Sequence, residues 1–123
     1  MPRSKVLFID NDPGMVGTYS TILRARNYDM STASEGEEGL QKARKERPDI
    51  VLLEVNLPDI SGYEVCFNLK SERFTREIPV LMMSNSSQSD SVMKARSCGA
   101  VDYIVKPFNL ITLLNKIKKF LAR

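Results

Sequence analysis

The chain has 123 residues, of which 42% are hydrophobic and 27% are charged, as expected for one soluble domain with a single core. A formal net charge of +3 is too small to indicate nucleic-acid binding, so we expect no direct contact with nucleic acid. The sequence contains no histidine, which excludes a histidine-containing triad, a histidine-ligated zinc site and a phosphohistidine module in this chain. No apolar run approaches the length of a membrane span and no signal-peptide core is recognisable, so we expect a cytoplasmic protein without a membrane partner.

Short apolar runs alternate with longer amphipathic segments along the chain. Near-continuous apolar runs followed by helices are typical of parallel strands covered on both faces. We therefore predict an α/β fold of five strand–helix units around a parallel sheet. With no linker-like stretch, residues 1–123 are expected to form one domain. The runs that predict strands are Val6–Ile9, Tyr28–Ala33, Ile50–Leu53, Val80–Met83 and Val101–Val105.

Start signals mark the first three predicted helices. Asp12 followed by Pro13 predicts an N-cap with proline in the first turn. Ser34 with Glu37 three residues later has the pattern of a capping box, in which the two residues cap each other. Ser61 is expected to cap the third helix.

The last two helices are also bounded by recognisable residues. One is predicted between Gln88 and Ser97 and ends at Gly99. The final helix is expected to begin after Asn109 as N-cap. Its apolar stripe comprises Leu110, Leu113, Leu114, Ile117 and Leu121.

The two cysteines, Cys66 and Cys98, fall within helix-like patterns. In a chain expected to stay in the reducing cytosol, we predict packed, reduced thiols rather than a disulfide.

Polar side chains follow the predicted strands at their carboxyl ends, where open α/β sheets gather their chemistry. An acid cluster, a hydroxyl and a lysine from four distant segments should meet there, although Asp12 alone is explained by helix capping. These residues are Asp10, Asn11 and Asp12 after the first strand, Glu54 after the third, Ser84 after the fourth and Lys106 after the fifth.

Four blocks of the sequence together resemble a known family. They are "VLFIDND", "DIVLLEVNLPDISGYE", "IPVLMMS" and "GAVDYIVKPF". In this combination the chain resembles the CheY-like receiver domains of two-component response regulators over essentially its whole length. The resemblance implies a flavodoxin-like sheet of strand order 2-1-3-4-5, a cis Lys106–Pro107 peptide bond and a sensor histidine kinase or another signalling protein as partner.

The resemblance also assigns roles to single residues. In such domains an Asp at the end of the third strand accepts a phosphoryl group from a kinase, and Mg²⁺ is held by that Asp, by acids after the first strand and by a backbone carbonyl. Asp10 and the Asn56 carbonyl match the metal positions, and Ser84 and Lys106 match the phosphate-contacting positions. Tyr103 occupies the position of the aromatic switch residue.

Two residues depart from the family pattern. The phosphoacceptor position holds Glu54, whose carboxylate extends about 1.5 Å further than that of Asp, and such a shift can cost about 100-fold in a geometry-limited step. Asn11 replaces the second acid and removes a full charge, although Mg²⁺ prefers anionic oxygen ligands. We therefore expect at most a weakened Mg²⁺ site, formed by Asp10, Glu54 and Asn56.

Three functions remain open from the sequence. The first is an atypical, non-enzymatic receiver that signals by protein contact with little or no phosphorylation, and the second is a conventional receiver that uses Glu54 or another residue. The third is a flavin or nucleotide enzyme on the same fold, but "DNDPGM" after the first strand is too acidic to hold a phosphate and no glycine-rich phosphate motif is present, so neither cofactor is expected.

By resemblance, the face formed by the fourth helix, fifth strand and fifth helix is the docking or dimerisation surface. An output domain beyond this chain is a further expected partner. The charged and aromatic residues of that face are Lys94, Arg96, Tyr103, Lys116 and Lys119. For the lysines, a solvated helix surface is favoured over a defined site for an acidic partner.

Overall fold

Five strands alternate with five helices in this computed structural model, which describes residues 3–122. Met1, Pro2 and Arg123 of the expected domain lie outside the described residues. Within the described part, no helix has the length and apolarity needed to cross a membrane. The elements are β1 (Lys5–Ile9), α1 (Pro13–Ala25), β2 (Asp29–Ala33), α2 (Gly36–Glu46), β3 (Ile50–Glu54), α3 (Gly62–Ser71), β4 (Val80–Ser84), α4 (Ser89–Ser97), β5 (Asp102–Val105) and α5 (Leu110–Leu121).

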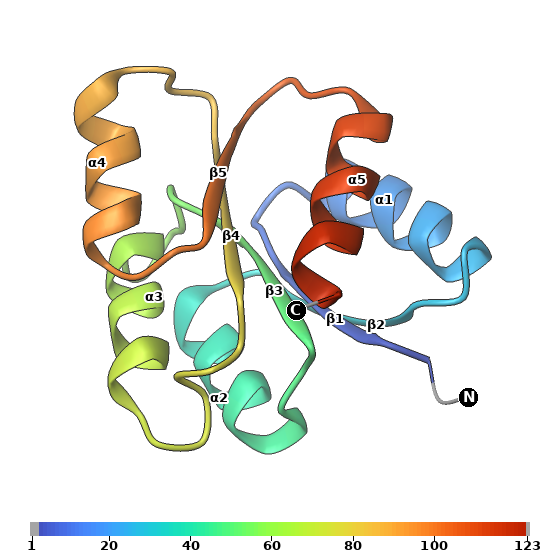
Figure 1. The fold of residues 1–123 in the computed structure, drawn as a ribbon, viewed down its shortest axis with the longest axis horizontal. Helices are drawn as coiled ribbons and strands as arrows, with labels where there is room; N and C mark the ends of the chain where they lie inside the picture. Colours follow the sequence, from blue (N-terminus) through green and yellow to red (C-terminus); the bar gives the residue numbers. More distant parts are fainter. Residues whose placement is uncertain (1–2, 123) are drawn as a thin grey trace.

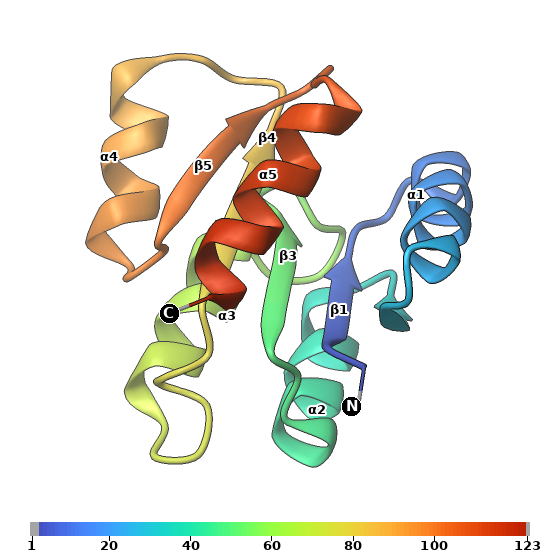
Figure 2. The same ribbon diagram turned by 45° about the vertical axis from the view of Figure 1, so that its right-hand side comes forward.

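The strands form one parallel sheet in the order β2-β1-β3-β4-β5, which confirms the predicted fold class (Figure 1). Figure 2 shows β1, β3, β4 and β5 in this order. Chain order reverses between β1 and β3, where Leu7 pairs with Val51 and Ile9 with Leu53. In an open α/β sheet, the carboxyl ends of strands beside such a switch point form a crevice. The fold therefore directs the residues after β1 and β3 toward a common site.

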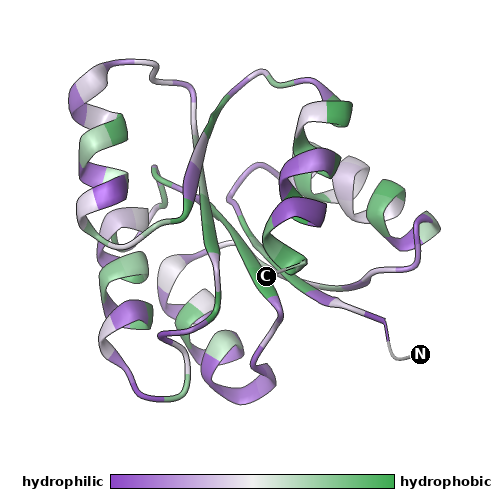
Figure 3. Cartoon of the chain, viewed as in Figure 1, coloured by the Kyte–Doolittle hydropathy of each residue, from purple (hydrophilic) through white to green (hydrophobic). Residues whose placement is uncertain are grey.

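Helices cover both faces of the sheet (Figure 1). Alternate strand residues point to opposite faces, so each strand contributes to two cores. One core joins the sheet to α2, α3 and α4, and the other joins it to α1 and α5. The central strands β3 and β4 are accordingly largely green in Figure 3, whereas the helices mix hydrophilic and hydrophobic segments.

Most of the predicted helix ends are confirmed. The Asp12 carboxylate caps α1 by accepting the Gly14 and Met15 N–H groups at 3.1 and 3.2 Å. Ser61 caps α3 and Asn109 caps α5, each through its side-chain oxygen. Gly99 follows α4 with a φ of +100°, a left-handed conformation that favours glycine.

The predicted capping box of α2 is wrong. Glu35, not Ser34, is the N-cap residue, and its side chain makes no capping hydrogen bond. The Asp59 carboxylate from the β3–α3 loop instead accepts the Gly36 and Glu37 N–H groups at 2.7 and 2.9 Å. A long-range acid therefore replaces the local cap that the pattern indicated.

Element limits differ from the predicted ones by small shifts. Glu54 and Ser84 are the last residues of β3 and β4 rather than the residues after them. In α5 the buried stripe ends with Phe120, which is 7% exposed, whereas Leu121 is only partly buried. The helix packs through Phe120 because it lies three residues after Ile117 on the same face.

Candidate functional site

Lys106 joins two acids at the carboxyl edge of the sheet. Its Nζ donates to Asp10 Oδ2 at 2.7 Å and to Glu54 Oε1 at 2.5 Å. The side chains are largely withdrawn from solvent, with exposed fractions of 16% for Lys106, 1% for Asp10 and 9% for Glu54. Asp10 directly follows β1, Glu54 ends β3 and Lys106 directly follows β5, so residues far apart in sequence form one buried ion cluster.

Each carboxylate also accepts a backbone hydrogen bond through its other oxygen. Asp12 N–H donates to Asp10 Oδ1 at 3.0 Å, and Asn56 N–H donates to Glu54 Oε2 at 3.0 Å. Buried carboxylates need such donors because an unpaired buried charge is costly. Both acids are thus fixed in orientation by the loop that follows their strand.

The pKa of Lys106 lies above its ordinary value of 10.5. Burial by itself lowers this pKa, but the hydrogen bonds and negative charges of Asp10 and Glu54 outweigh that effect. The lysine is therefore charged at neutral pH.

Ser84 and Tyr103 lie on the β4 and β5 side of the same edge. Ser84 is 2% exposed, and its Oγ accepts the Ser86 N–H at 3.2 Å. The Tyr103 hydroxyl donates to the Ser86 carbonyl at 2.8 Å. Lys106 N–H donates to the Ser84 carbonyl at 2.7 Å, and the following Lys106–Pro107 peptide bond is cis. These contacts link the lysine, the hydroxyl and the aromatic residue through backbone.

Other residues hold the β4–α4 loop and were not anticipated from the sequence. The Tyr63 hydroxyl donates to the Ser91 carbonyl at 3.2 Å, and the Ser86 and Ser91 hydroxyls are 3.0 Å apart. Tyr63 of α3 therefore contacts the first turn of α4, Ser91 links that turn to Ser86 in the loop, and Tyr103 of β5 holds the loop itself. Serines and tyrosines give little sequence signal for such long-range contacts.

The predicted acid pocket is smaller than expected. Asn11 and Asp12 are exposed, and the Asp12 carboxylate is engaged as the α1 cap, so it does not join Asp10. Asn56 is exposed and contributes its N–H to Glu54. Lys106 brings the Asp10 and Glu54 carboxylates together, whereas Asp12 and Asn56 contact them through backbone N–H groups.

Asp10 and Glu54 are the two carboxylates at this edge that could hold Mg²⁺. Mg²⁺ prefers several anionic oxygen ligands in octahedral geometry. Both carboxylates here already bind the Lys106 ammonium. Among residues 3–122, no three His, Cys, Asp or Glu side chains lie close enough together to hold a metal ion.

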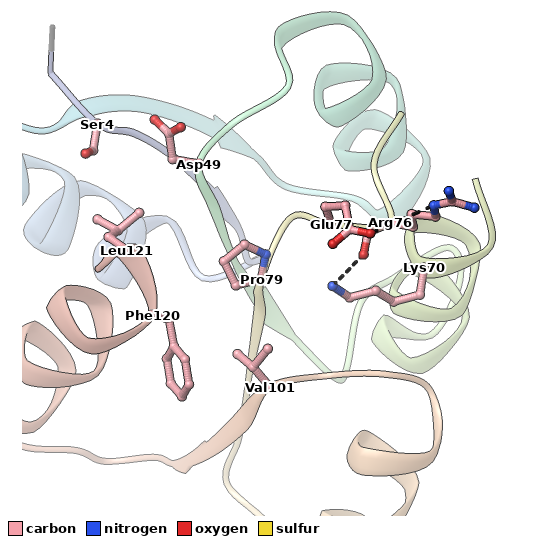
Figure 4. A pocket seen from close by; sticks show the side chains of 9 residues that line it. All are labelled: Ser4, Asp49, Lys70, Arg76, Glu77, Pro79, Val101, Phe120 and Leu121. Carbon is pink, nitrogen blue, oxygen red and sulfur yellow. Dashed lines mark hydrogen bonds and ion pairs between the residues drawn. The ribbon is translucent and has the colours of Figure 1, made fainter. Parts of the chain in front are cut away.

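A surface hollow lies at the amino-terminal ends of the strands, opposite the Lys106 cluster (Figure 4). Its volume is about 520 Å³, and it is lined by residues that precede β1, β3, β4 and β5 and by the end of α5. Lys70 borders it and donates to the Arg76 carbonyl at 3.1 Å and to the Ile78 carbonyl at 2.5 Å. This hollow is separate from the Lys106 cluster and has no part in its chemistry.

The fold and the strand-end cluster together define the class of protein. The sequence model described as "Response regulator receiver domain" matches residues 6–118. The chain belongs to the response regulator receiver domain family.

Named relatives agree with this assignment. The DNA-binding dual master transcriptional regulator RpaA of Synechocystis is 34% identical over 123 residues, which are 100% of this chain and 50% of that protein. The alkaline phosphatase synthesis transcriptional regulatory protein PhoP of Bacillus subtilis is 34% identical over 98% of this chain and 50% of its own length. The chain thus spans about half the length of the curated relatives it matches.

A solved structure supports the fold independently. The crystal structure of a putative response regulator from Chloroflexus aurantiacus superposes with a TM-score of 0.93 at 31% identity. The match covers 98% of this chain and 99% of that one. Similar chains thus adopt the same arrangement from end to end.

Proposed function

We propose that this receiver transmits its signal by protein contact, with little or no phosphorylation. The ion pair between Lys106 Nζ and Glu54 Oε1 at 2.5 Å carries the proposal. At the position where the family resemblance expects an Asp that accepts phosphate, a longer carboxylate already binds the lysine that would contact the phosphoryl group. Its single charge partly imitates a modified Asp, which would carry nearly two charges and a third acceptor oxygen.

Weak metal binding is part of the same proposal. Asn11 supplies no charge, and Lys106 neutralises part of the charge of Asp10 and Glu54. A divalent cation would have to compete with the ammonium for these oxygens. Since phosphoryl transfer relies on positioning and on charge neutralisation, both requirements are weakened here.

Phosphoryl donors test the proposal directly. Acetyl phosphate or beryllofluoride with Mg²⁺ should leave the amide NMR spectrum of the wild-type protein unchanged. The Glu54→Asp and Asn11→Asp double substitution restores acceptor length and metal charge, so it should gain Mg²⁺-dependent phosphorylation. Glu54→Asp alone should gain less, because one metal charge is still missing. The double substitution combined with Ser84→Ala serves as the matched control and should lose part of the gain.

A large, saturable shift at Ser84 and Tyr103 in the wild-type protein would overturn the proposal. That result would favour the second candidate, a conventional receiver that uses Glu54 or another residue. This candidate is supported by Ser84 at the end of β4 and Lys106 directly after β5, the positions at which the family resemblance expects contacts to a phosphoryl group. A flavin-binding role is a remote third candidate, and a yellow chromophore in the purified protein would revive it.

The proposed partners follow from the family and from the exposed surface. We assign docking or homodimerisation to the face formed by α4, β5 and α5, where Met93, Val105 and Ile111 are apolar and 64%, 37% and 66% exposed. A sensor histidine kinase or another cytoplasmic signalling protein is the proposed input. Since RpaA and PhoP are about twice as long, we propose that residues 1–123 act as one receiver domain in a protein with an output domain.

A further inference from the structure

Two cysteines meet between α3 and α4. Cys66 lies on the buried side of α3, and Cys98 is the residue that ends α4. The Cys66 thiol donates to the Cys98 carbonyl oxygen at 3.3 Å, across 32 positions of sequence. Both are free thiols in this structure. The fold therefore brings two oxidisable cysteines from α3 and the end of α4 into contact.

Their surroundings differ in a way that separates their reactivity. Cys66 is 0% exposed, whereas Cys98 is partly exposed. Cys98 lines a surface hollow of about 420 Å³ together with Tyr63, Phe67 and Lys94. A small oxidant can therefore reach Cys98 from solvent, whereas the buried Cys66 is shielded from it.

The pKa values of the two thiols also indicate that Cys98 is the more reactive one. A hydrogen bond from the Cys66 thiol lowers the pKa of Cys98, burial opposes this effect, and the Ala100 N–H adds to the lowering. The same hydrogen bond and burial raise the pKa of Cys66. Since the thiolate is the nucleophile, Cys98 is the thiol that reacts first.

We propose that Cys98 and Cys66 form an oxidation site for a small hydroperoxide, with Cys98 as the attacked thiol and Cys66 as the resolving thiol. The Cys98 thiolate attacks one peroxide oxygen, an S–O bond forms, the O–O bond breaks, and the leaving hydroxide takes up a proton to become water. Cys66 then loses its proton and attacks the Cys98 sulfur. The S–S bond forms as the S–O bond breaks and a second water leaves, so two thiols are oxidised by two electrons and the peroxide is reduced.

The bond would connect the buried side of α3 to the end of α4. To form it, the Cys98 thiol must leave the Ala95 carbonyl, to which it now donates at 3.1 Å. The backbone there is fixed by the Cys98 N–H bond to Lys94 and the Ala100 N–H bond to Ala95, each 3.0 Å long. Because α4 also forms part of the docking face named above, a disulfide at its C-terminal end would restrict the position of this helix. The oxidation itself does not depend on Glu54.

Mass spectrometry of the folded protein tests the site. Reduced wild-type protein is treated with hydrogen peroxide, and remaining thiols are then blocked with N-ethylmaleimide. We expect the two peptides that contain Cys66 and Cys98 to be linked, with no maleimide on either and full reversal by dithiothreitol. Peptide mapping separates this linkage from oxygen added to the exposed Met93.

Single substitutions assign the two roles. In Cys66→Ala, oxidation should stop at a Cys98 sulfenic acid that dimedone traps. In Cys98→Ser, Cys66 should remain unmodified as long as circular dichroism shows a folded protein. If Cys66→Ala does not fold, the linkage map of the wild-type protein still decides the question.

Three results would overturn the proposal. Both thiols could still react with maleimide after peroxide treatment, Cys98 could gain oxygen in the wild-type protein without becoming linked, or the disulfide could join two copies on a non-reducing gel. Failure here is distinguishable from failure of the proposed function, because the phosphoryl-donor experiment uses fully reduced protein.

Discussion

Lys106 is the residue on which the charge balance of the site depends. It is the cation that both buried acids contact, at 2.7 Å for Asp10 and 2.5 Å for Glu54. Removing one partner of a buried ion cluster leaves uncompensated charge and typically costs about 3 kcal/mol of unfolding free energy or more. The lysine is therefore expected to contribute to stability as well as to signalling.

Lys106→Met tests this contribution through its pH dependence. Because the folded-state pKa of Lys106 is raised, its stabilisation is fully present below the unfolded pKa of about 10.4 and is lost as pH rises through the folded pKa. Urea unfolding should show the wild-type protein about 3 kcal/mol more stable than Lys106→Met at pH 7, with the gap narrowing above about pH 10.5.

Lys116→Met is the matched control. Lys116 also forms an ion pair, with Asp102 at 2.5 Å, but both side chains are more exposed, 27% and 30%. An exposed pair contributes about 0 to 1 kcal/mol. Equal losses in the two lysine variants at pH 7 would contradict the role given to the buried cluster.

Gly62 shows how closely α3 approaches the end of β3. A Cβ at this position would lie 2.2 Å from the Glu54 carbonyl oxygen and 2.8 Å from Val55 Cα. Both are backbone atoms, so the chain itself would have to shift. The Gly62 N–H also donates to the Val55 carbonyl at 2.8 Å, which fixes the start of α3 beside the site.

Gly62→Ala is expected to lower the unfolding free energy by more than about 2 kcal/mol, because the added carbon overpacks backbone. Gly17→Ala is the control, since its Cβ would meet nothing within 4 Å in the exposed part of α1. That substitution should stabilise by about 0.5–1 kcal/mol through helix propensity. Comparable effects of the two substitutions in urea unfolding would disprove the close approach.

At the scale of an element, α2 depends on an acid outside its own sequence. The Asp59 carboxylate accepts the first two helical N–H groups, Gly36 and Glu37, with both oxygens. The Glu37 hydrogen bond lowers the pKa of Asp59, burial opposes this effect, and the Gly36 hydrogen bond adds to the lowering. The β3–α3 loop and the start of α2 are thereby joined.

Asp59→Ala should therefore destabilise the protein by about 1 kcal/mol, the usual loss for a helix cap. Because the folded-state pKa of Asp59 is lowered, this stabilisation is present above its unfolded pKa, near pH 4, and is lost as pH falls through the folded pKa. Thermal unfolding of the wild-type protein and Asp59→Ala at pH 7 and pH 3 measures the stability loss and its dependence on pH. Ser34→Ala, the residue that the sequence pattern favoured as the cap, should change stability by less than about 0.5 kcal/mol. A larger loss from Ser34→Ala than from Asp59→Ala would restore the local capping box.

At the scale of the whole molecule, β3 unites the two cores. Leu53 belongs to the core shared with α2, α3 and α4, and Leu52 to the core shared with α1 and α5. Both side chains are 0% exposed. Adjacent residues of one strand thus pack on opposite faces, so loss of either core should disturb the other.

Leu53→Ala and Leu52→Ala should each cost about 2–5 kcal/mol. In each variant, far-ultraviolet circular dichroism and tyrosine fluorescence should report one coincident unfolding transition. Ile111→Ala, at a residue 66% exposed, should change stability by less than about 0.5 kcal/mol. Two separate transitions in either core variant would show that the faces unfold independently.

The amino-acid sequence by itself determined the fold class, the parallel strands and most helix ends. Local signals suffice for these features, because apolar runs, Asp12 before Pro13 and a glycine at position 99 act over a few residues. It also placed Asp10, Glu54, Ser84 and Lys106 at strand ends, where a parallel sheet must bring them near each other.

Which side chains contact one another across the molecule depends on the tertiary structure. Lys106 pairing with both acids, Asp59 capping α2 and Cys66 lying against Cys98 are contacts between segments 22 to 96 positions apart. No local pattern encodes such contacts, since they depend on how helices and loops pack on the finished sheet. Side chains that the sequence presents alike, such as Asp10 and Asp12, thus separate into a buried ion pair and an exposed helix cap.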